Sequence, residues 1–147
     1  MSLKDKLMND LKEAMKDKDT VRKNAVQMVR ASVLQFEKDN KVTLDDDGVV
    51  EVVAKEVKKR KDVLPEYEKS GRSDLIDDLK KEIEVLMAYL PQQMSEDEIE
   101  ALVIEAISQT EAKTMKDIGK VMAVIMPKTK GKADGKVINL LVKKHLS

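Results

Sequence analysis

The chain has 147 residues, of which 41% are hydrophobic, 38% are charged and only 2% are aromatic. This length fits one domain or a larger domain followed by a smaller one, and the absence of cysteine excludes disulfides, a thiolate nucleophile and a cysteine-based zinc site. A core of Leu, Val, Ile, Met and Ala in a sequence rich in Lys and Glu is typical of amphipathic helices. The composition therefore predicts an all-α fold.

The formal net charge is zero, but charge is unevenly distributed along the chain. Residues 112–147 contain nine lysines and two aspartates, a net charge of +7, so the first 111 residues carry −7. A basic segment of this kind indicates an anionic partner. The alternative interpretation is a basic surface that is only hydrated.

The amino terminus and the apolar runs indicate the cellular compartment. Residues 1–6, Met-Ser-Leu-Lys-Asp-Lys, carry charges where a secretory signal peptide has its apolar stretch. No uncharged apolar run approaches the roughly 18 residues of a membrane span. We therefore expect a cytoplasmic protein without a membrane partner.

Two helices are expected at the start of the chain. Apolar residues recur at helical spacing from Leu3 to Met15 and again from Val21 to Phe36. Asp19 or Thr20 is placed to cap the second of these helices. The polar segment 39–42 ends it.

The next two helices are delimited by capping and breaking residues. A Thr43-x-x-Asp46 capping box is expected to open the third helix, and Ser70-Gly71 to stop it. Pro65 is expected to kink this helix or end its regular part. The fourth helix starts near Ser73, ends at Pro91 and is expected to bury five apolar residues: Leu75, Leu79, Ile83, Leu86 and Leu90.

Three further helices follow a short polar segment, residues 90–95, which is the candidate linker. Capping boxes Ser95-x-x-Glu98 and Thr114-x-x-Asp117 open the fifth and sixth helices, and Pro127 is expected to stop the sixth. Asp134 is expected to cap the seventh. We predict a four-helix amino-terminal bundle over residues 1–92 and a small, basic three-helix bundle over residues 93–147.

The segment from Pro127 to Lys136 is the candidate binding site. Its lysines supply positive charge, its glycines permit close backbone approach, and the N–H groups of the following helix favour an anion such as a nucleic-acid phosphate. Asp134 would contribute through capping, since its own charge repels phosphate. The candidate RNA-binding residues, including two lysines one turn apart in the sixth helix, are Lys116, Lys120, Lys128, Lys130, Gly131, Lys132, Gly135 and Lys136.

Each of these features also has a structural interpretation. The basic segment lacks the spacing of a phosphate-binding Walker loop and is equally compatible with an ordinary connection between helices. Gly119, inside the sixth helix, is expected to allow close helix packing, and the alternative is close approach of a ligand. The basic run 58–61 points all around a helix and is expected to be a hydrated surface.

Residues suited to catalysis are scarce. His145 is the only histidine and lies next to the carboxy terminus, and no serine is placed beside a plausible base. The paired carboxylates all have capping or surface interpretations. We therefore predict no catalytic residues, no metal site and no cofactor.

Three motifs resemble a known family. The run from Gly119 to Lys136 resembles the tail signature of the GatB/YqeY family. Tyr67-x-x-x-Gly-Arg-Ser-Asp-Leu75 and Tyr89-Leu-Pro-Gln-Gln-Met-Ser95 resemble the amino-terminal part of the stand-alone YqeY-like proteins, which match essentially the whole chain. The tail domain of the aspartyl/glutamyl-tRNA amidotransferase matches only about residues 95–147. The chain departs from the family pattern at Ala123, where relatives often have glycine.

The resemblance implies two helical subdomains and a role in translation. In the amidotransferase the tail domain contacts tRNA, and related modules are appended to some glutaminyl-tRNA synthetases. We therefore predict a non-catalytic tRNA-binding accessory module. The alternative is a protein-interaction subunit of an amidotransferase or aminoacyl-tRNA synthetase, with the acidic amino-terminal bundle as the contact. A third interpretation is an enzyme with the family-level activity, carbon–nitrogen ligation with glutamine as the amido-N donor, although the catalytic domain of the amidotransferase is absent.

Overall fold

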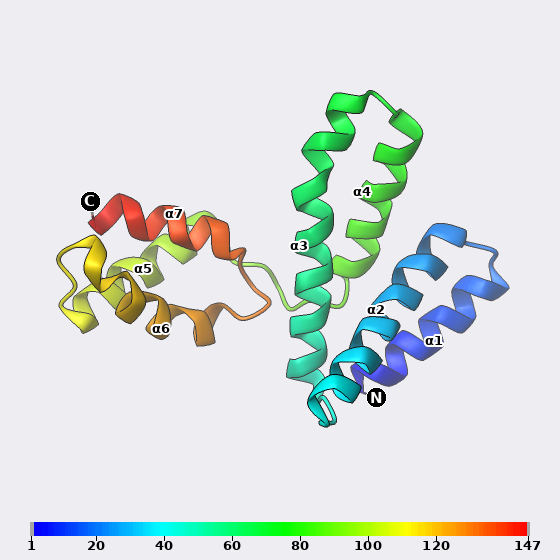
Figure 1. Cartoon of the computed structure of the whole chain (residues 1–147), viewed down its shortest axis with the longest axis horizontal. Helices are drawn as coiled ribbons and strands as arrows, with labels where there is room; N and C mark the ends of the chain where they lie inside the picture. Colours follow the sequence, from blue (N-terminus) through cyan, green and yellow to red (C-terminus); the bar gives the residue numbers. More distant parts are fainter. Residues whose placement is uncertain (1, 147) are drawn as a thin grey trace. The chain divides into compact units, whose positions relative to one another are not determined.

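The computed structural model describes residues 2–146, which form seven α-helices, one short 3-10 helix and no strand (Figure 1). The predicted all-α class and the number of helices are confirmed. Contacts between residues divide the chain into two compact units, the first ending at Leu90 and the second beginning at Pro91. We call them the amino-terminal unit and the carboxy-terminal unit.

The amino-terminal unit contains four helices: α1 (Leu3–Lys16), α2 (Thr20–Asn40), α3 (Asp46–Ser70) and α4 (Ser73–Met87). α1 and α2 run antiparallel, so that Lys4 near the start of α1 pairs with Glu37 near the end of α2. α4 packs against both α2 and α3 (Figure 1). These contacts bring all four helices around one apolar core.

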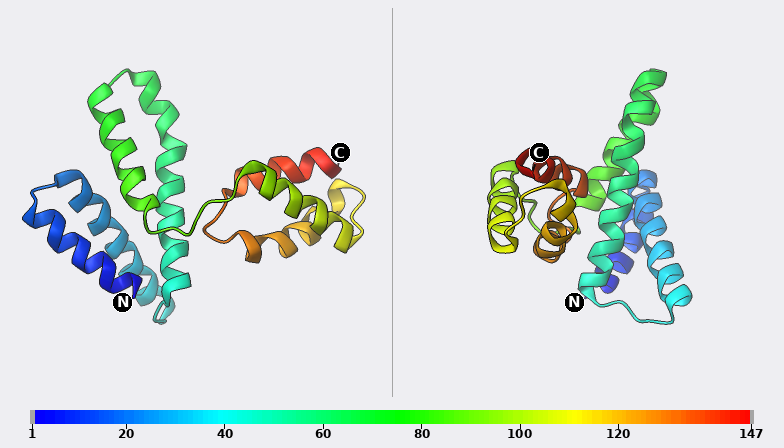
Figure 2. Two further views of the ribbon diagram at one scale, coloured as in Figure 1. Left: turned by 180° about the vertical axis from the view of Figure 1, so that it is seen from behind. Right: turned by 60° about the vertical axis from the view of Figure 1, so that its left-hand side comes forward.

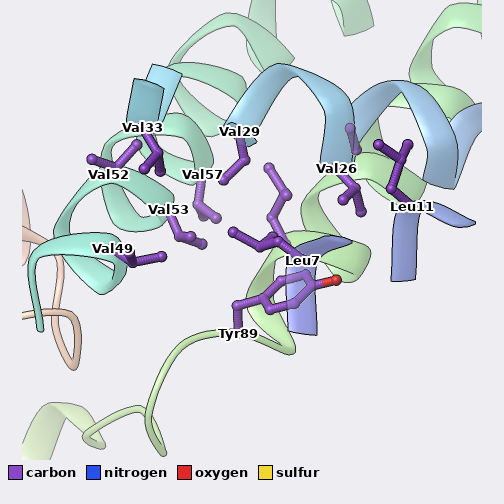
Figure 3. Close-up of a cluster of buried hydrophobic side chains, with 12 residues drawn as sticks. Leu7, Leu11, Val26, Val29, Val33, Val49, Val52, Val53, Val57 and Tyr89 are labelled. Atoms are coloured by element: carbon purple, nitrogen blue, oxygen red, sulfur yellow. The ribbon is translucent and has the colours of Figure 1, made fainter. Parts of the chain in front are cut away.

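The core of the amino-terminal unit consists mainly of valine and leucine, as the low aromatic content requires (Figure 3). Tyr89 is the aromatic member, and its hydroxyl donates a hydrogen bond to Asp10 while the ammonium of Lys6 lies 5.1 Å from its ring centre. The main buried side chains are Leu7, Leu11, Val26, Val29, Val33, Val49, Val52, Val53, Val57 and Leu86.

Some predicted details of α3 and α4 are wrong. Asp45, not Thr43, caps α3, and its carboxylate accepts the N–H of Gly48 at 2.9 Å. α4 ends at Met87, before the predicted end at Pro91. Leu75, expected in the core, is 38% exposed, because the α3–α4 hairpin extends beyond α1 and α2 at its tip (Figure 1).

Two helices also continue past a proline. α3 runs through Pro65 and ends at Ser70, with Gly71 as its cap, so the predicted stop at Ser70-Gly71 is confirmed. The sixth helix continues through Pro127 for two more residues, so the predicted stop at Pro127 is wrong. The residues four positions before the two prolines are exposed. Water can therefore reach the carbonyls that lack a helical donor.

The carboxy-terminal unit contains α5 (Glu96–Thr110), the 3-10 helix η1 (Met115–Asp117), α6 (Ile118–Thr129) and α7 (Gly135–Leu146) (Figure 2). The predicted capping box of Ser95 and Glu98 is present, as is that of Thr114 and Asp117. α5 packs against α6 and α7, and the buried residues are Ile99, Val103, Ala106, Val121, Ile125, Ile138, Leu141, Val142 and Leu146.

Across residues 2–146, none of the helices has the combination of length and hydrophobicity needed to cross a membrane.

Candidate nucleic-acid interface

One side of α6 is exposed along the helix. Gly119, Ala123 and Met126 follow one another at spacings of four and three residues, which places them on the same face. All three are exposed, Met126 to 49%. A Cβ atom added at Gly119 would meet no atom within 4 Å, so this glycine does not serve close helix packing, and that prediction is wrong. The backbone of α6 is instead open to an approaching ligand.

Exposed lysines lie near both ends of α6. Lys116 lies in η1, just before α6, Lys120 lies in the first turn of α6, and Lys128 lies in its last turn, half a turn around the helix from Gly119. The Nζ atom of Lys120 is 4.0 Å from a carboxylate oxygen of Asp117, which offsets part of the positive charge at the start. We call this surface the α6 face; its members are Lys116, Gly119, Lys120, Ala123, Met126, Pro127 and Lys128.

The loop after α6 is held in place by the segment before α5. Gly131 has a φ of +72°, in the left-handed region that glycine tolerates. Its carbonyl accepts a hydrogen bond from the Gln93 side chain at 2.8 Å, and the carbonyl of Lys132 accepts the N–H of Met94 at 2.9 Å. The lysines of this loop are therefore presented from a fixed backbone.

The start of α7 is less suited to an anion than its sequence indicates. The carboxylate of Asp134 accepts the N–H of Lys136 at 2.9 Å, as a helix cap does. Gly135 lies between them, and a Cβ atom there would meet nothing within 4 Å. A phosphate at this helix terminus would compete with Asp134, itself an anion, for the N–H of Lys136. Part of the phosphate site predicted at the start of α7 is thus taken by a carboxylate.

Acidic residues also lie close to the loop. The first turn of α5 contains Glu96, Asp97 and Glu98, which follow Met94 by two to four residues. These carboxylates suit the positive end of the α5 dipole. They follow the segment whose backbone bonds the loop at Lys132, and their negative charge opposes the attraction of the loop for a polyanion. The α6 face is therefore the better part of the basic surface.

The structure also changes the interpretation of charge along the chain. Residues 1–90 contain 19 Lys and Arg against 20 Asp and Glu, and residues 91–147 contain nine against eight. Much of the negative charge assigned to the first 111 residues belongs to α5, in the carboxy-terminal unit. The description of the amino-terminal unit as acidic is wrong, because this unit is nearly neutral.

A buried ionic cluster in the amino-terminal unit was not predicted. Arg60 lies within the basic run 58–61, yet it is only 7% exposed and bonds Glu56 at 3.0 Å. Ser32 donates to the same carboxylate at 3.0 Å, and Nε of Arg60 lies 3.7 Å from Glu82. The four-residue spacing of Glu56 and Arg60, beside buried valines, was the signal that could have revealed it.

This cluster perturbs the acidity of both carboxyl groups. Burial opposes the charge of Glu56, but hydrogen bonds from Arg60 and Ser32 outweigh it and hold the pKa of Glu56 below its usual value. For Glu82 burial dominates and raises the pKa, with Arg60 opposing the rise. The cluster links α3 to α2 through the hydrogen bond of Ser32 and to α4 through the ionic contact of Arg60 with Glu82.

Groups suited to metal binding do not converge in the described part of the chain. Residues 2–146 contain no cluster of three or more His, Cys, Asp or Glu side chains that could hold a metal ion. His145 bonds Glu100 at 2.9 Å, and this hydrogen bond lowers the pKa of Glu100. The contact ties the end of α7 to α5.

Comparison with known proteins identifies relatives. The family model described as "Yqey-like protein" matches residues 4–146. A protein of Pyrenophora tritici-repentis, "Altered inheritance of mitochondria protein 41, mitochondrial", is 27% identical over 130 residues, covering 87% of this chain and 71% of that protein. Proteins with the same name from Kluyveromyces lactis and Lachancea thermotolerans are 35% and 34% identical over 106 residues, covering 69% and 70% of this chain. The chain spans only 57% of the length of these two relatives.

Proposed function

The chain belongs to the YqeY-like protein family, and we propose that it is a tRNA-binding accessory module without catalytic activity of its own. In this proposal the two units act as a four-helix amino-terminal bundle and a three-helix carboxy-terminal bundle, and the latter contacts the RNA. The observation that carries the proposal is the α6 face, where an open helix backbone lies between lysines.

The α6 face supports contact with a phosphate backbone. Exposed lysines at its two ends supply point charges, and the small residues Gly119 and Ala123 between them let a strand approach closely. The chain has no tryptophan, one phenylalanine and two tyrosines, and all three aromatic residues lie in residues 1–90, so stacking of bases on aromatic rings contributes little in the carboxy-terminal unit. Recognition therefore depends on charge and shape, with little sequence specificity.

Pro127 gives a reason for RNA to be preferred over DNA. Proline has no N–H, so the carbonyl of Ala123 lacks its usual helical donor, and Ala123 is exposed on the α6 face. A ribose 2′-OH can donate a hydrogen bond to such a carbonyl, whereas deoxyribose cannot. The α6 face thus combines affinity for phosphate with a feature that distinguishes the sugar.

Equilibrium binding across a salt series tests the proposal. The purified chain is titrated into bulk tRNA and into DNA duplex of similar length, and log K is plotted against log salt. Each phosphate contact contributes a slope of roughly −0.7 to −0.9. We expect tRNA to bind more tightly than DNA. Undetectable tRNA binding at low salt would exclude direct RNA binding.

Matched lysine variants assign the binding to a surface. Replacing Lys116 and Lys128 by alanine should make the slope of log K against log salt shallower by the contribution of about two phosphate contacts. Lys58 and Lys61, exposed on α3, are the control pair, and their replacement should leave the slope unchanged. Equal slopes for the two double variants would remove the α6 face from the proposal.

Two further parts of the proposal need separate measurements. A partner amidotransferase or aminoacyl-tRNA synthetase would be retained by the chain at high salt even when the α6-face lysines are replaced.

We propose a cytoplasmic protein, whereas the names of the fungal relatives place those proteins in mitochondria. Imaging of the tagged full-length protein in its own cells distinguishes the two compartments.

A further inference from the structure

A cavity of about 280 Å³ lies between α1 and α2 in the amino-terminal unit. Its apolar walls come from Leu7 and Met8 on α1 and from Val33 and Leu34 on α2. Leu7 and Val33 are buried in the core, whereas Leu34 is 59% exposed. The cavity therefore opens from the core to an apolar rim on the surface.

The two ends of this cavity differ in charge. At one end Lys4 is neutralised by its ion pair with Glu37, and Asp5 adds a further carboxylate. At the other end lies Arg30, one turn of α2 before Leu34. Within residues 2–146 its guanidinium has neither a hydrogen bond nor an ion pair. Arg30 thus gives one end of an apolar cavity an uncompensated positive charge.

The dimensions favour an inserted side chain over an enclosed small molecule. Pockets that enclose small ligands usually measure roughly 300–1,000 Å³ and cover most of the ligand surface. This cavity is at the lower limit of that range, and the exposed Leu34 leaves its rim open. Residues that contribute most to protein interfaces are enriched in arginine and cluster around well-packed pockets.

We propose that this cavity is a docking site for an acidic amphipathic helix of a partner protein, which inserts an apolar side chain and pairs a carboxylate with Arg30. Arg30 and Leu34 are four residues apart on α2, so their Cβ atoms are separated by about 5–6 Å. A helix with leucine and glutamate three or four residues apart presents the complementary pair at the same spacing. The site lies in the amino-terminal unit and does not depend on the proposed RNA binding.

A synthetic helical peptide serves as the probe. It has about 16 residues of alanine and glutamine with one Leu–Glu pair four residues apart, and it is titrated into the ¹⁵N-labelled full chain. We expect amide shifts centred on Met8, Arg30 and Leu34, and none in the carboxy-terminal unit. A peptide with lysine in place of glutamate should bind about fivefold more weakly, because an ion pair is replaced by repulsion.

Charge reversal on the protein tests the assigned contact. Arg30→Glu should invert the preference, so that the lysine peptide binds more tightly than the glutamate peptide. Leu34→Ala should weaken both peptides. Leu140→Ala, a change at a leucine that is 69% exposed in the other unit, and Arg72→Ala at an exposed arginine are the matched controls. We expect both controls to keep the affinity for the glutamate peptide.

Three results would overturn the proposal. The first is the absence of peptide binding at millimolar peptide concentration with the chain folded. The second is peptide binding that Arg30→Glu leaves unchanged. The third uses decanoate as a small amphiphilic anion: Arg30-dependent shifts with decanoate, and none with the peptide, would make the cavity a small-ligand site.

Discussion

Substitution of Gly119 by glutamine is expected to raise stability and lower tRNA affinity at the same time. Gly119 is the second residue of α6, and a Cβ atom there meets no other atom within 4 Å. Replacing glycine by a residue of higher helix propensity stabilises a helix by up to about 1 kcal/mol, and by less near its start. A gain of about 0.5 kcal/mol should raise the melting temperature of the carboxy-terminal unit by about 2–4 °C.

The same glutamine side chain covers the helix backbone on the α6 face. If RNA approaches there, the substitution removes a contact of about 1 kcal/mol, which lowers the affinity for tRNA about fivefold. The slope of log K against log salt should stay the same, because no charge is removed. Calorimetry measures the first effect and fluorescence anisotropy with labelled tRNA measures the second.

Gly119→Ala is the matched control for this experiment. A methyl group supplies a comparable gain in helix propensity but obstructs the backbone far less, so the affinity for tRNA should change by less than about twofold. Unchanged tRNA affinity in the glutamine variant, with a raised melting temperature, would refute contact between RNA and the α6 face. A lowered melting temperature would refute the open environment described for Gly119.

Three further substitutions test other parts of the structure. Pro127→Ala supplies the N–H that the Ala123 carbonyl lacks, so the ratio of the Kd values for DNA and tRNA should fall about threefold. Ile125→Ala removes a fully buried side chain and should lower the free energy of unfolding, measured in urea, by about 2–5 kcal/mol. Glu56→Gln leaves the buried Arg60 without its closest carboxylate and should lower the same quantity by up to about 3 kcal/mol at pH 7. Since folding lowers the pKa of Glu56, this contribution is complete above pH 4.5 and is lost as the pH falls through the folded pKa, so the variant and the wild type should converge in acid.

The helices could be predicted because their signals are local. Capping boxes and apolar spacing involve residues within a few positions, and the box at Ser95 and Glu98 forms as its sequence indicates. The start of α3 was mispredicted because Thr43 and Asp45 both suit a cap. The choice depends on Leu44, whose N–H donates to Glu37 of α2 at 2.7 Å and whose side chain packs on the core. That contact is tertiary, so local sequence does not contain it.

The candidate site depended on information that spacing along the chain does not carry. Gly119 fits equally well in a packed or an open helix face, and only the packing of α5 and α7 against α6 decides between them. The loop after α6 is fixed by Gln93, which lies 38 residues before Gly131. Arg30 was not predicted as a site residue, because a single arginine indicates a binding site only when a cavity lies beside it, and the sequence does not show the cavity.

The charge of the carboxy-terminal unit determines the kind of RNA binding that its α6 face can support. Nine lysines there are nearly balanced by eight carboxylates, so the unit has little long-range attraction for RNA. At physiological salt charges are screened beyond about 8 Å, and a few lysine contacts give Kd values on the order of 10⁻⁴–10⁻⁶ M. If the chain binds RNA as proposed, binding of this strength becomes effective when a second attachment holds the chain near the RNA, because tethering raises the effective concentration to about the millimolar range. The cavity at Arg30 lies in the other unit and is suited to such an attachment. A partner docked on α1 and α2 would therefore determine tRNA engagement as much as the lysines of α6.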